Sequence, residues 1–283
     1  MTPGLHQTGA RRPAETGPDA GPAGGTDPAR PGERGAALGA GVPDAGDPSS
    51  RISRSSHPRR RRRPLVDRGP RPLIRGWFHL VAACLSVVSG TVLTTFAWMT
   101  LPWWQALGVT VYAVGLLTLF GVSAAYHRGP WRSEAAVRWW RRADHATIAV
   151  FIAATYTPLC LIVLEPAQAA WMLGTAWLGA IGGVVLNLVW IGHPRWLDVV
   201  VYLALGWLIV PLIPQLWHSA GPAVVWLLFA GGVIYSLGAV VYGARWPGRS
   251  ARWYGYHEHF HTATIIAAVV HLVAVWMVVV QGG

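Results

Sequence analysis

The chain is poor in the residues that keep soluble proteins in water. From Leu65 to the last residue there is no lysine, and six acidic residues stand against 12 arginines. So few charges spread over more than 200 residues exclude an ordinary soluble domain, in which about a quarter of the residues are charged. The two cysteines, Cys84 and Cys160, lie in different apolar runs. They argue against a disulfide framework or a thiolate metal site and are expected to be small core residues.

The first 64 residues lack nearly all of the aliphatic and aromatic side chains that could form a core. Gly, Pro, Ala, Ser and Arg dominate this segment, which cannot bury enough apolar surface to offset the entropy of ordering the chain. We therefore predict that residues 1–64 form a disordered basic tail. The tail ends in "HPRRRRRP" (57–64). An arginine block can bind nucleic acid, but one that directly precedes a membrane span is better explained as a cytoplasmic topology and anionic-lipid signal, so no nucleic-acid partner is expected.

Apolar sequence dominates the remainder of the chain, in seven runs separated by short polar connections. Each run is long enough, or nearly so, to cross a hydrocarbon layer of about 30 Å as a helix. Residues 65–283 are therefore predicted to form an all-α integral membrane domain of seven transmembrane helices. The runs cover residues 76–97, 103–126, 144–164, 169–191, 197–217, 222–243 and 260–280.

Arginine is unevenly distributed among the connections between the runs. Nine arginines follow residue 76, and all of them lie in the connections after the second, fourth and sixth runs. The connections after the first, third and fifth runs contain none, and Glu165 is their only charge. Because arginine-rich connections stay on the cytoplasmic side, we expect the N-terminus in the cytoplasm and the C-terminus outside.

With this topology, unusual polar residues gather at the cytoplasmic ends of three helices. Ser123 and His127 end the second run, and Asp144 begins the third. His257 and His261 begin the seventh run four residues apart, which places them on one helical face. Three histidines from two helices, with a water molecule, satisfy the tetrahedral geometry of a catalytic zinc. Asp144 is then a ligand or a hydrogen-bond acceptor for the bound water, and Ser123 a hydrogen-bonding partner within the site.

The remaining histidines are given weaker interpretations. Histidines at a membrane boundary are usually interfacial, and five of them are read in this way: His79, His145, His193, His218 and His259. His271, about 15 Å along the helix from His261 at 1.5 Å per residue, is too deep to join the same ion and is expected to line a cavity.

A second interpretation of the metal site stays open. "HEHFH" (257–261) matches the zinc-protease pattern H-E-x-x-H, in which the glutamate, here Glu258, is the general base. No acidic residue follows Glu258 to supply a late carboxylate ligand, so an intramembrane protease would need Asp144 as its third ligand.

Three motifs, "SAAYH", "RRADHATIAVFIAATYTP" and "HEHFHTATIIAAVVH", resemble the haemolysin III family over residues 71–283. This family is the bacterial branch of the progestin and adiponectin receptor superfamily. The resemblance implies seven helices with a cytoplasmic N-terminus in a bacterial plasma membrane. It also implies a zinc ion held by His127, His257 and His261, with Asp144 and Ser123 beside it. The acidic, asparagine-containing motif that many members carry before the first helix is missing: "RPLIRGWFHL" keeps only His79 in a comparable place.

Two functions fit these features. The first is a zinc-dependent hydrolase of lipid-like amides or esters, which the superfamily's similarity to alkaline ceramidases suggests. In this function zinc activates water, Asp144 holds or deprotonates it, and Ser123 donates to the developing oxyanion. The second is a receptor-like or cytolytic protein in which zinc is structural. An open coordination position that connects to a lipid-facing cavity would favour the first. Membrane lipids are expected partners in both cases, and the oligomeric state is left open.

Overall fold

The computed structural model describes residues 64–67, 72–190, 192–246 and 253–283. All regular structure in these residues is helical, and seven segments are long and apolar enough to cross a membrane. The predicted all-α class with seven spans is therefore confirmed. The tail that we predict to be disordered, residues 1–64, lies outside the described ranges except for Pro64.

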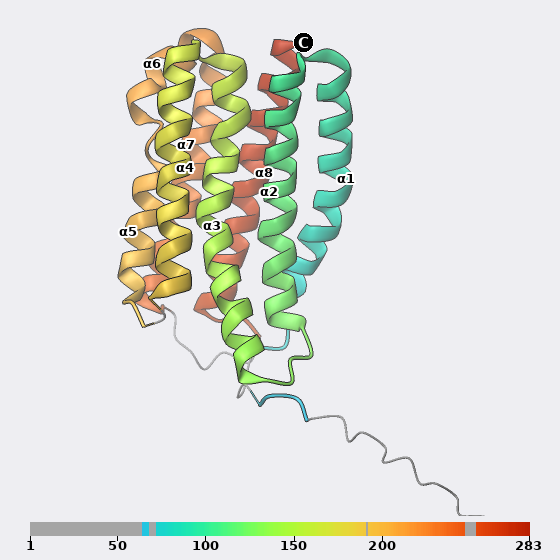
Figure 1. Cartoon of the computed structure of the whole chain (residues 1–283), viewed down its shortest axis with the longest axis vertical. Coiled ribbons are helices and arrows are strands. Elements are labelled where there is room, and N and C mark those ends of the chain that lie inside the picture. The colour runs from blue at the N-terminus through green and yellow to red at the C-terminus, as the bar shows by residue number, and fades with distance from the viewer. Residues whose placement is uncertain (1–63, 68–71, 191, 247–252) are drawn as a thin grey trace, which may run out of the picture. The chain divides into compact units, whose positions relative to one another are not determined.

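Successive spans run in opposite directions along the bundle, joined by short connections (Figure 1). Helix α8 packs against α7, α3 and α1, and helix α3 also packs against α2, α4 and α5, so these two helices organise the bundle. The elements are α1 (Trp77–Thr100), α2 (Trp103–Arg128), α3 (Glu134–Val163), α4 (Pro166–Val189), α5 (Arg195–Gly206), η1 (Val210–Leu212), α6 (Ile213–Ser219), α7 (Pro222–Ala244) and α8 (Tyr256–Gly282).

Helix α3 begins well before the apolar run that predicts it. It starts at Glu134, whereas the run starts at residue 144. The hydroxyl oxygen of Ser133 accepts a hydrogen bond from the backbone N–H of Ala136 at 3.2 Å and so caps the helix. Hydropathy reports only the part of a helix that lipid would surround, and the polar first turns of α3 were therefore missed.

The fifth span is not one continuous helix. It consists of α5, the 3-10 turn η1 and α6, and the break coincides with Pro211 and Pro214, which lack an N–H and clash with the preceding turn. The hydroxyl of Tyr156 on α3 donates to the carbonyl oxygens of Leu205 and Gly206, both at 2.8 Å. Unpaired backbone groups are costly inside a membrane, so Tyr156 stabilises the end of α5.

Close helix packing depends on small residues. A Cβ atom on Gly115 of α2 would lie 2.7 Å from the Cβ atom of Ala154 on α3, so glycine permits this approach of the two backbones. Cys160 is buried, as expected of a core residue, whereas Cys84 is exposed on α1. The expectation that both cysteines are core residues is therefore wrong for Cys84.

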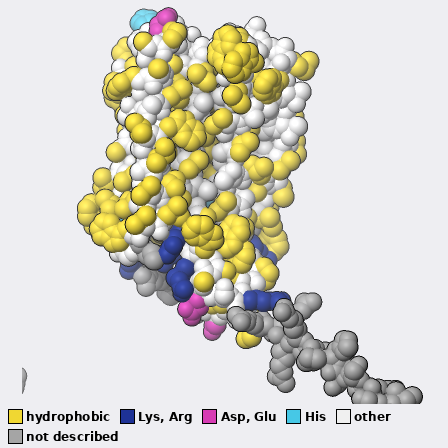
Figure 2. All heavy atoms as spheres, in the orientation of Figure 1, with side chains coloured by type: hydrophobic (Ala, Val, Ile, Leu, Met, Phe, Trp, Pro, Cys, Tyr) yellow, Lys and Arg dark blue, Asp and Glu magenta, His cyan; other side chains and the backbone are white. Residues whose placement is uncertain are grey.

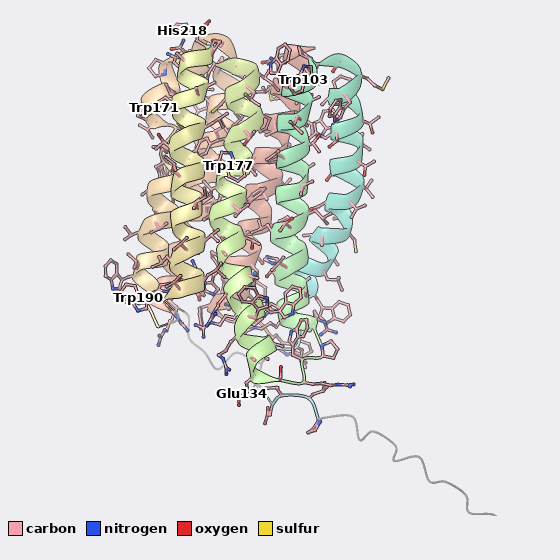
Figure 3. The ribbon with its side chains drawn as sticks, viewed as in Figure 1. Trp103, Glu134, Trp171, Trp177, Trp190 and His218 are labelled. Atoms are coloured by element: carbon pink, nitrogen blue, oxygen red, sulfur yellow. The ribbon has the colours of Figure 1, made fainter. Side chains whose placement is uncertain are left out.

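The outer face of the bundle is apolar along its sides and charged mainly at one end (Figure 2). Exposed apolar side chains such as Met99 (80% exposed) and Leu178 (70% exposed) suit contact with lipid. Exposed tryptophans lie near both ends, including Trp103 at one and Trp190 at the other (Figure 3). The arginine side chains gather at the end where α2 finishes and α8 begins (Figure 2).

Candidate metal centre

Three histidines converge where α2 ends and α8 begins. His127 lies in the last turn of α2, and His257 and His261 lie in the first turns of α8. One ring nitrogen of each lies within 4.8 Å of those of the other two, and His127 and His261 are buried. These three residues could therefore hold a metal ion, as their spacing in the sequence suggests.

One pair of rings in this cluster has a spacing close to that of two ligands on one metal ion. The Nε2 atoms of His127 and His257 lie 3.1 Å apart. Two imidazole ligands of a tetrahedral zinc lie about 3.4 Å apart, given metal–nitrogen distances of about 2.0–2.1 Å. The Nε2 atom of His261 is buried and has no hydrogen-bond partner among the described residues. A buried nitrogen without a partner is costly, and a metal ion would satisfy it.

His79 at the start of α1 is a part of this site that the sequence interpretation missed. Its side chain is buried, with 3% exposure, and its Nε2 atom lies 2.9 Å from the Nδ1 atom of His261. The expectation that His79 is an interfacial residue is therefore wrong. If the Nδ1–H of His261 donates to His79, the Nε2 lone pair of His261 faces the other two histidines. The boundary position of His79 in the sequence gave no sign of this contact, because the two residues are 182 positions apart.

The turn before α1 also packs closely against the site. Gly76 has a φ of 81°, and a Cβ atom on this residue would lie 2.6 Å from the Cβ atom of His127. A side chain here would therefore be strained and would push His127 out of place. Beside it, Arg75 Nε lies 2.6 Å from Oε1 of Glu258, which is 1% exposed.

Both carboxylate oxygens of Glu258 accept hydrogen bonds at the N-terminus of α8. Its Oε2 atom accepts the backbone N–H of Gly255 at 3.0 Å, and its other oxygen accepts from Arg75. The carboxylate thus closes the first turn of the helix and neutralises a partly buried arginine. A general base must face the water that it deprotonates, so this geometry disfavours the zinc-protease interpretation of "HEHFH".

Asp144 and Ser123 lie beside the histidines. Oδ2 of Asp144 is 3.7 Å from Nε2 of His127, and the Asp144 side chain is 12% exposed. Ser123 lies one turn before His127 on α2, and its hydroxyl is buried without a hydrogen-bond partner in the described ranges. Both residues line the same cavity as His257 and His261.

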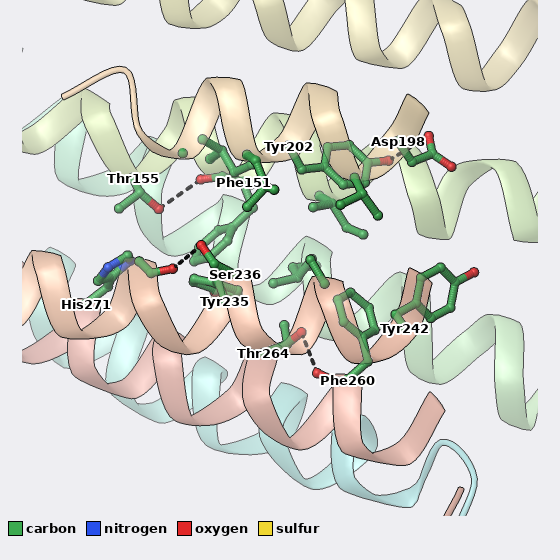
Figure 4. Close-up of a pocket in the computed structure, with 18 of the residues that line it drawn as sticks. Phe151, Thr155, Asp198, Tyr202, Tyr235, Ser236, Tyr242, Phe260, Thr264 and His271 are labelled. Carbon is green, nitrogen blue, oxygen red and sulfur yellow. Dashed lines mark hydrogen bonds between the residues drawn. The ribbon is translucent and has the colours of Figure 1, made fainter. Parts of the chain in front are cut away.

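This cavity is about 140 Å³ in volume and lies inside the bundle. Its lining includes His257 and His261 at one end. Phe151, Thr155, Phe260 and His271 also line it (Figure 4). The expectation that His271 lines a cavity is therefore confirmed. Most of the wall is apolar, which suits an apolar group.

A second polar cluster surrounds Asp198 on α5, which is 4% exposed. His193 Nε2 lies 2.9 Å from Oδ1 of Asp198, and His145 Nδ1 lies 3.5 Å from Oδ2. The Asn187 amide donates to Oδ1 at 3.3 Å, as does the Tyr202 hydroxyl at 3.4 Å. His145 and His193 are therefore not simple interfacial residues: they compensate a buried carboxylate and connect α3, α4 and α5.

Other histidines match the weaker interpretation. His259 is exposed and lies against the ring of Tyr254, with ring centroids 4.5 Å apart. His218 is exposed at the opposite end of the bundle (Figure 3). Among the contacts of the described residues, neither has one with the three histidines like that between His79 and His261.

Comparison with known proteins assigns the family. The model of the family described as "Haemolysin-III related" matches residues 68–272. The chain belongs to the haemolysin III family. The match covers α1 to α7 and the first part of α8 with all three histidines, and it confirms the resemblance carried by the three motifs.

Named relatives of this haemolysin III protein come from bacteria and animals. "Hemolysin-3 homolog" of Bacillus subtilis (strain 168) is 30% identical over 179 residues, 63% of this chain and 83% of the relative. "Hemolysin-3" of Bacillus cereus is 29% identical over 164 residues, 58% of this chain and 74% of the relative. The human "Monocyte to macrophage differentiation factor" is 30% identical over 179 residues, 61% of this chain and 71% of the relative. Family and helices together make the protein an integral membrane protein of the plasma membrane that contacts membrane lipids.

Proposed function

We propose that this haemolysin III protein is a zinc-dependent hydrolase of lipid-like amides or esters. The observation that supports it best is that His257 and His261, two of the three clustered histidines, line the apolar cavity within the bundle together with Asp144. A purely structural ion needs four protein ligands and no adjoining space. Here the cluster has three histidines, and two of them line a cavity whose wall is mostly apolar.

In this proposal His127, His257 and His261 hold the ion. When bound, zinc would lower the pKa of water towards about 7 and polarise the substrate carbonyl. Asp144 would accept the proton of the attacking water, because its carboxylate lies 3.7 Å from His127 on the cavity wall. Ser123, whose hydroxyl lacks a partner in the described residues, would donate to the carbonyl oxygen as negative charge develops there.

The cavity would hold the acyl chain and keep bulk water away from the ester or amide group. We also infer that the arginine-rich end of the bundle faces the cytoplasm, since that end carries the charges that the positive-inside rule assigns to this side. The reacting groups then lie near the cytoplasmic surface and the chain extends towards the middle of the membrane.

The test is to compare wild type with Asp144→Asn for zinc content, melting temperature and hydrolysis of short-chain ceramides. Loss of a general base typically costs about 10²- to 10⁴-fold in rate, and we expect a loss of this size with the zinc content retained. Glu258→Gln is the second variant, because a zinc-protease mechanism would make it the more damaging change.

The outcomes separate the candidate functions. Zinc-dependent turnover that falls in Asp144→Asn supports the hydrolase. Equal, zinc-independent background in all three proteins, with melting temperature following zinc content, contradicts the hydrolase and leaves a structural zinc in a receptor-like or cytolytic protein.

A further inference from the structure

The end of the cavity that lies farthest from the three histidines is polar. His271, Tyr235, Ser236 and Thr155 line this end (Figure 4). Phe151 and Thr264 line the wall between it and the level of His261. Along α8, His271 lies ten residues beyond His261, which corresponds to about 15 Å. Polar groups near the middle of a membrane bundle are costly and usually face a cavity or a polar partner.

Two hydrogen-bonding positions at this end remain available. Nε2 of His271 lies 3.2 Å from the carbonyl oxygen of Leu228, so with the proton on Nε2 the Nδ1 atom keeps its lone pair as an acceptor. The Tyr235 hydroxyl is buried and has no hydrogen-bond partner among the described residues. The two rings are neighbours, with centroids 5.7 Å apart. The site thus offers one acceptor and one hydroxyl.

The other polar groups at this end are already satisfied as donors. Ser236 Oγ donates to the Gly232 carbonyl at 2.7 Å and accepts from Trp207 Nε1 at 3.1 Å. The hydroxyl of Thr155 donates to the Phe151 carbonyl at 2.9 Å. Among these side chains Tyr235 is therefore the one with an unused donor, and the imidazole Nδ1 of His271 is a stronger acceptor than the hydroxyl oxygen of Thr155.

The packing of α7 makes room for the His271 ring. A Cβ atom on Gly231 would lie 2.2 Å from Nε2 of His271, so any larger residue would displace the imidazole. A leucine in place of His271 would complete an apolar wall without a buried polar group. The position of the ring, against a glycine and beside Tyr235, indicates a built site.

We propose that His271 and Tyr235 recognise a hydroxyl group in the middle of the lipid chain that occupies the cavity. A single hydroxyl can donate to Nδ1 of His271 and accept from Tyr235, which uses both available positions. The chemical class is a lipid with a mid-chain hydroxyl and an ester or amide group at the other end of the cavity. The inference rests on the proposed function, because it requires an acyl chain in the cavity.

The test measures binding of product-like acids, which are not consumed by hydrolysis. Purified full-length protein is titrated with a saturated fatty acid and with derivatives of that acid that carry one hydroxyl at successive mid-chain positions. Hydrogen bonds to buried groups are worth about 0.5–1.5 kcal/mol each. For the two bonds of the proposal we therefore expect one positional isomer to bind about 5- to 150-fold more tightly than the plain acid. Tyr235→Phe should reduce this preference and leave binding of the plain acid nearly unchanged.

Tyr112→Phe is the matched control, since its hydroxyl is also buried without a partner in the described residues but Tyr112 does not line the cavity. Equal binding of all acids to wild type, or a preference that survives in Tyr235→Phe, overturns the inference while the proposed function stands. If no acid binds at all, the acyl-chain assignment fails and the proposed function fails with it.

Discussion

His79 contacts the histidine triad from outside it, through His261. Metal-binding histidines usually donate the other ring N–H to a partner that fixes their orientation, and loss of that partner weakens metal binding about 10- to 100-fold. His79 Nε2, 2.9 Å from Nδ1 of His261, is in this position. We therefore predict that His79→Leu weakens zinc binding by about this factor, as measured by competition with a chelator.

Two further variants test the cause of that effect. His79→Gln offers an amide oxygen as an acceptor and should recover part of the affinity. His259→Ala removes an exposed histidine from the same helix and should leave the affinity unchanged. Wild-type affinity in His79→Leu would contradict an orienting role for His79.

Some residues of the candidate site can be predicted from the sequence and others cannot. His257 and His261 are four positions apart, so helical geometry alone predicts a shared face. His127 could be joined to them because both motifs lie at membrane boundaries of one topology. His79 and Arg75 could not be assigned, because their partners His261 and Glu258 are 182 and 183 positions away and no local spacing records the contact.

At the scale of elements, hydropathy located every span but not its internal geometry. The fifth run reads as one apolar segment, yet the structure divides it into α5, η1 and α6. Proline at 211 and 214 signals the break, but a proline within a membrane span can also produce only a kink. The break is compatible with the bundle interior because the hydroxyl of Tyr156 satisfies the carbonyls at the end of α5.

We predict that Tyr156→Phe destabilises the protein by about 1–3 kcal/mol, because two buried carbonyl oxygens lose their donor. Thermal unfolding in detergent measures the effect. Tyr235→Phe is a control of the same chemistry, since its hydroxyl has no partner in the described part of the chain. Equal melting temperatures of the two variants would show that Tyr156 does not stabilise the broken span.

The connection between α4 and α5 should respond to pH. Burial and the charge of Arg141 lower the pKa of His193. The hydrogen bonds to the Trp190 carbonyl and to Asp198, together with the Asp198 charge, outweigh them and raise the pKa above 6.5. A raised pKa means that the folded state binds the proton more tightly than the unfolded state. The stabilisation is therefore complete below pH 6.5 and is lost as pH rises through the folded-state pKa.

His193→Gln tests this pH dependence. The difference in melting temperature between wild type and variant should be largest on the acidic side of pH 6.5 and should shrink on the alkaline side. His145 also faces Asp198 and is retained in both proteins, so the comparison isolates the change at His193. A difference that stays constant or grows with pH would contradict the prediction.

At the scale of the whole molecule, the site joins helices that are distant in sequence. The candidate metal ligands come from α2 and α8, Asp144 comes from α3, and His79 comes from α1. The cavity between them is bounded by α5 and α7 as well. The apolar runs predict seven spans but not their lateral order, so the shared cavity follows only from the packed bundle.

A metal ion at this position should therefore stabilise the entire bundle. A ligand that binds only the folded state stabilises it by about 2.7 kcal/mol at 100 times its Kd, and an ion held by His127, His257 and His261 would clamp α2 to α8. We predict that adding zinc to chelator-treated wild type raises its melting temperature, and that the increment disappears in His127→Ala, His257→Ala and His261→Ala. The increment compares each variant with and without zinc. Packing contacts that a substitution removes are missing from both measurements and therefore do not change it.

His259→Ala should keep the full increment, because its exposed ring takes no part in the cluster. An increment that persists in all three alanine variants would place the zinc elsewhere in the molecule.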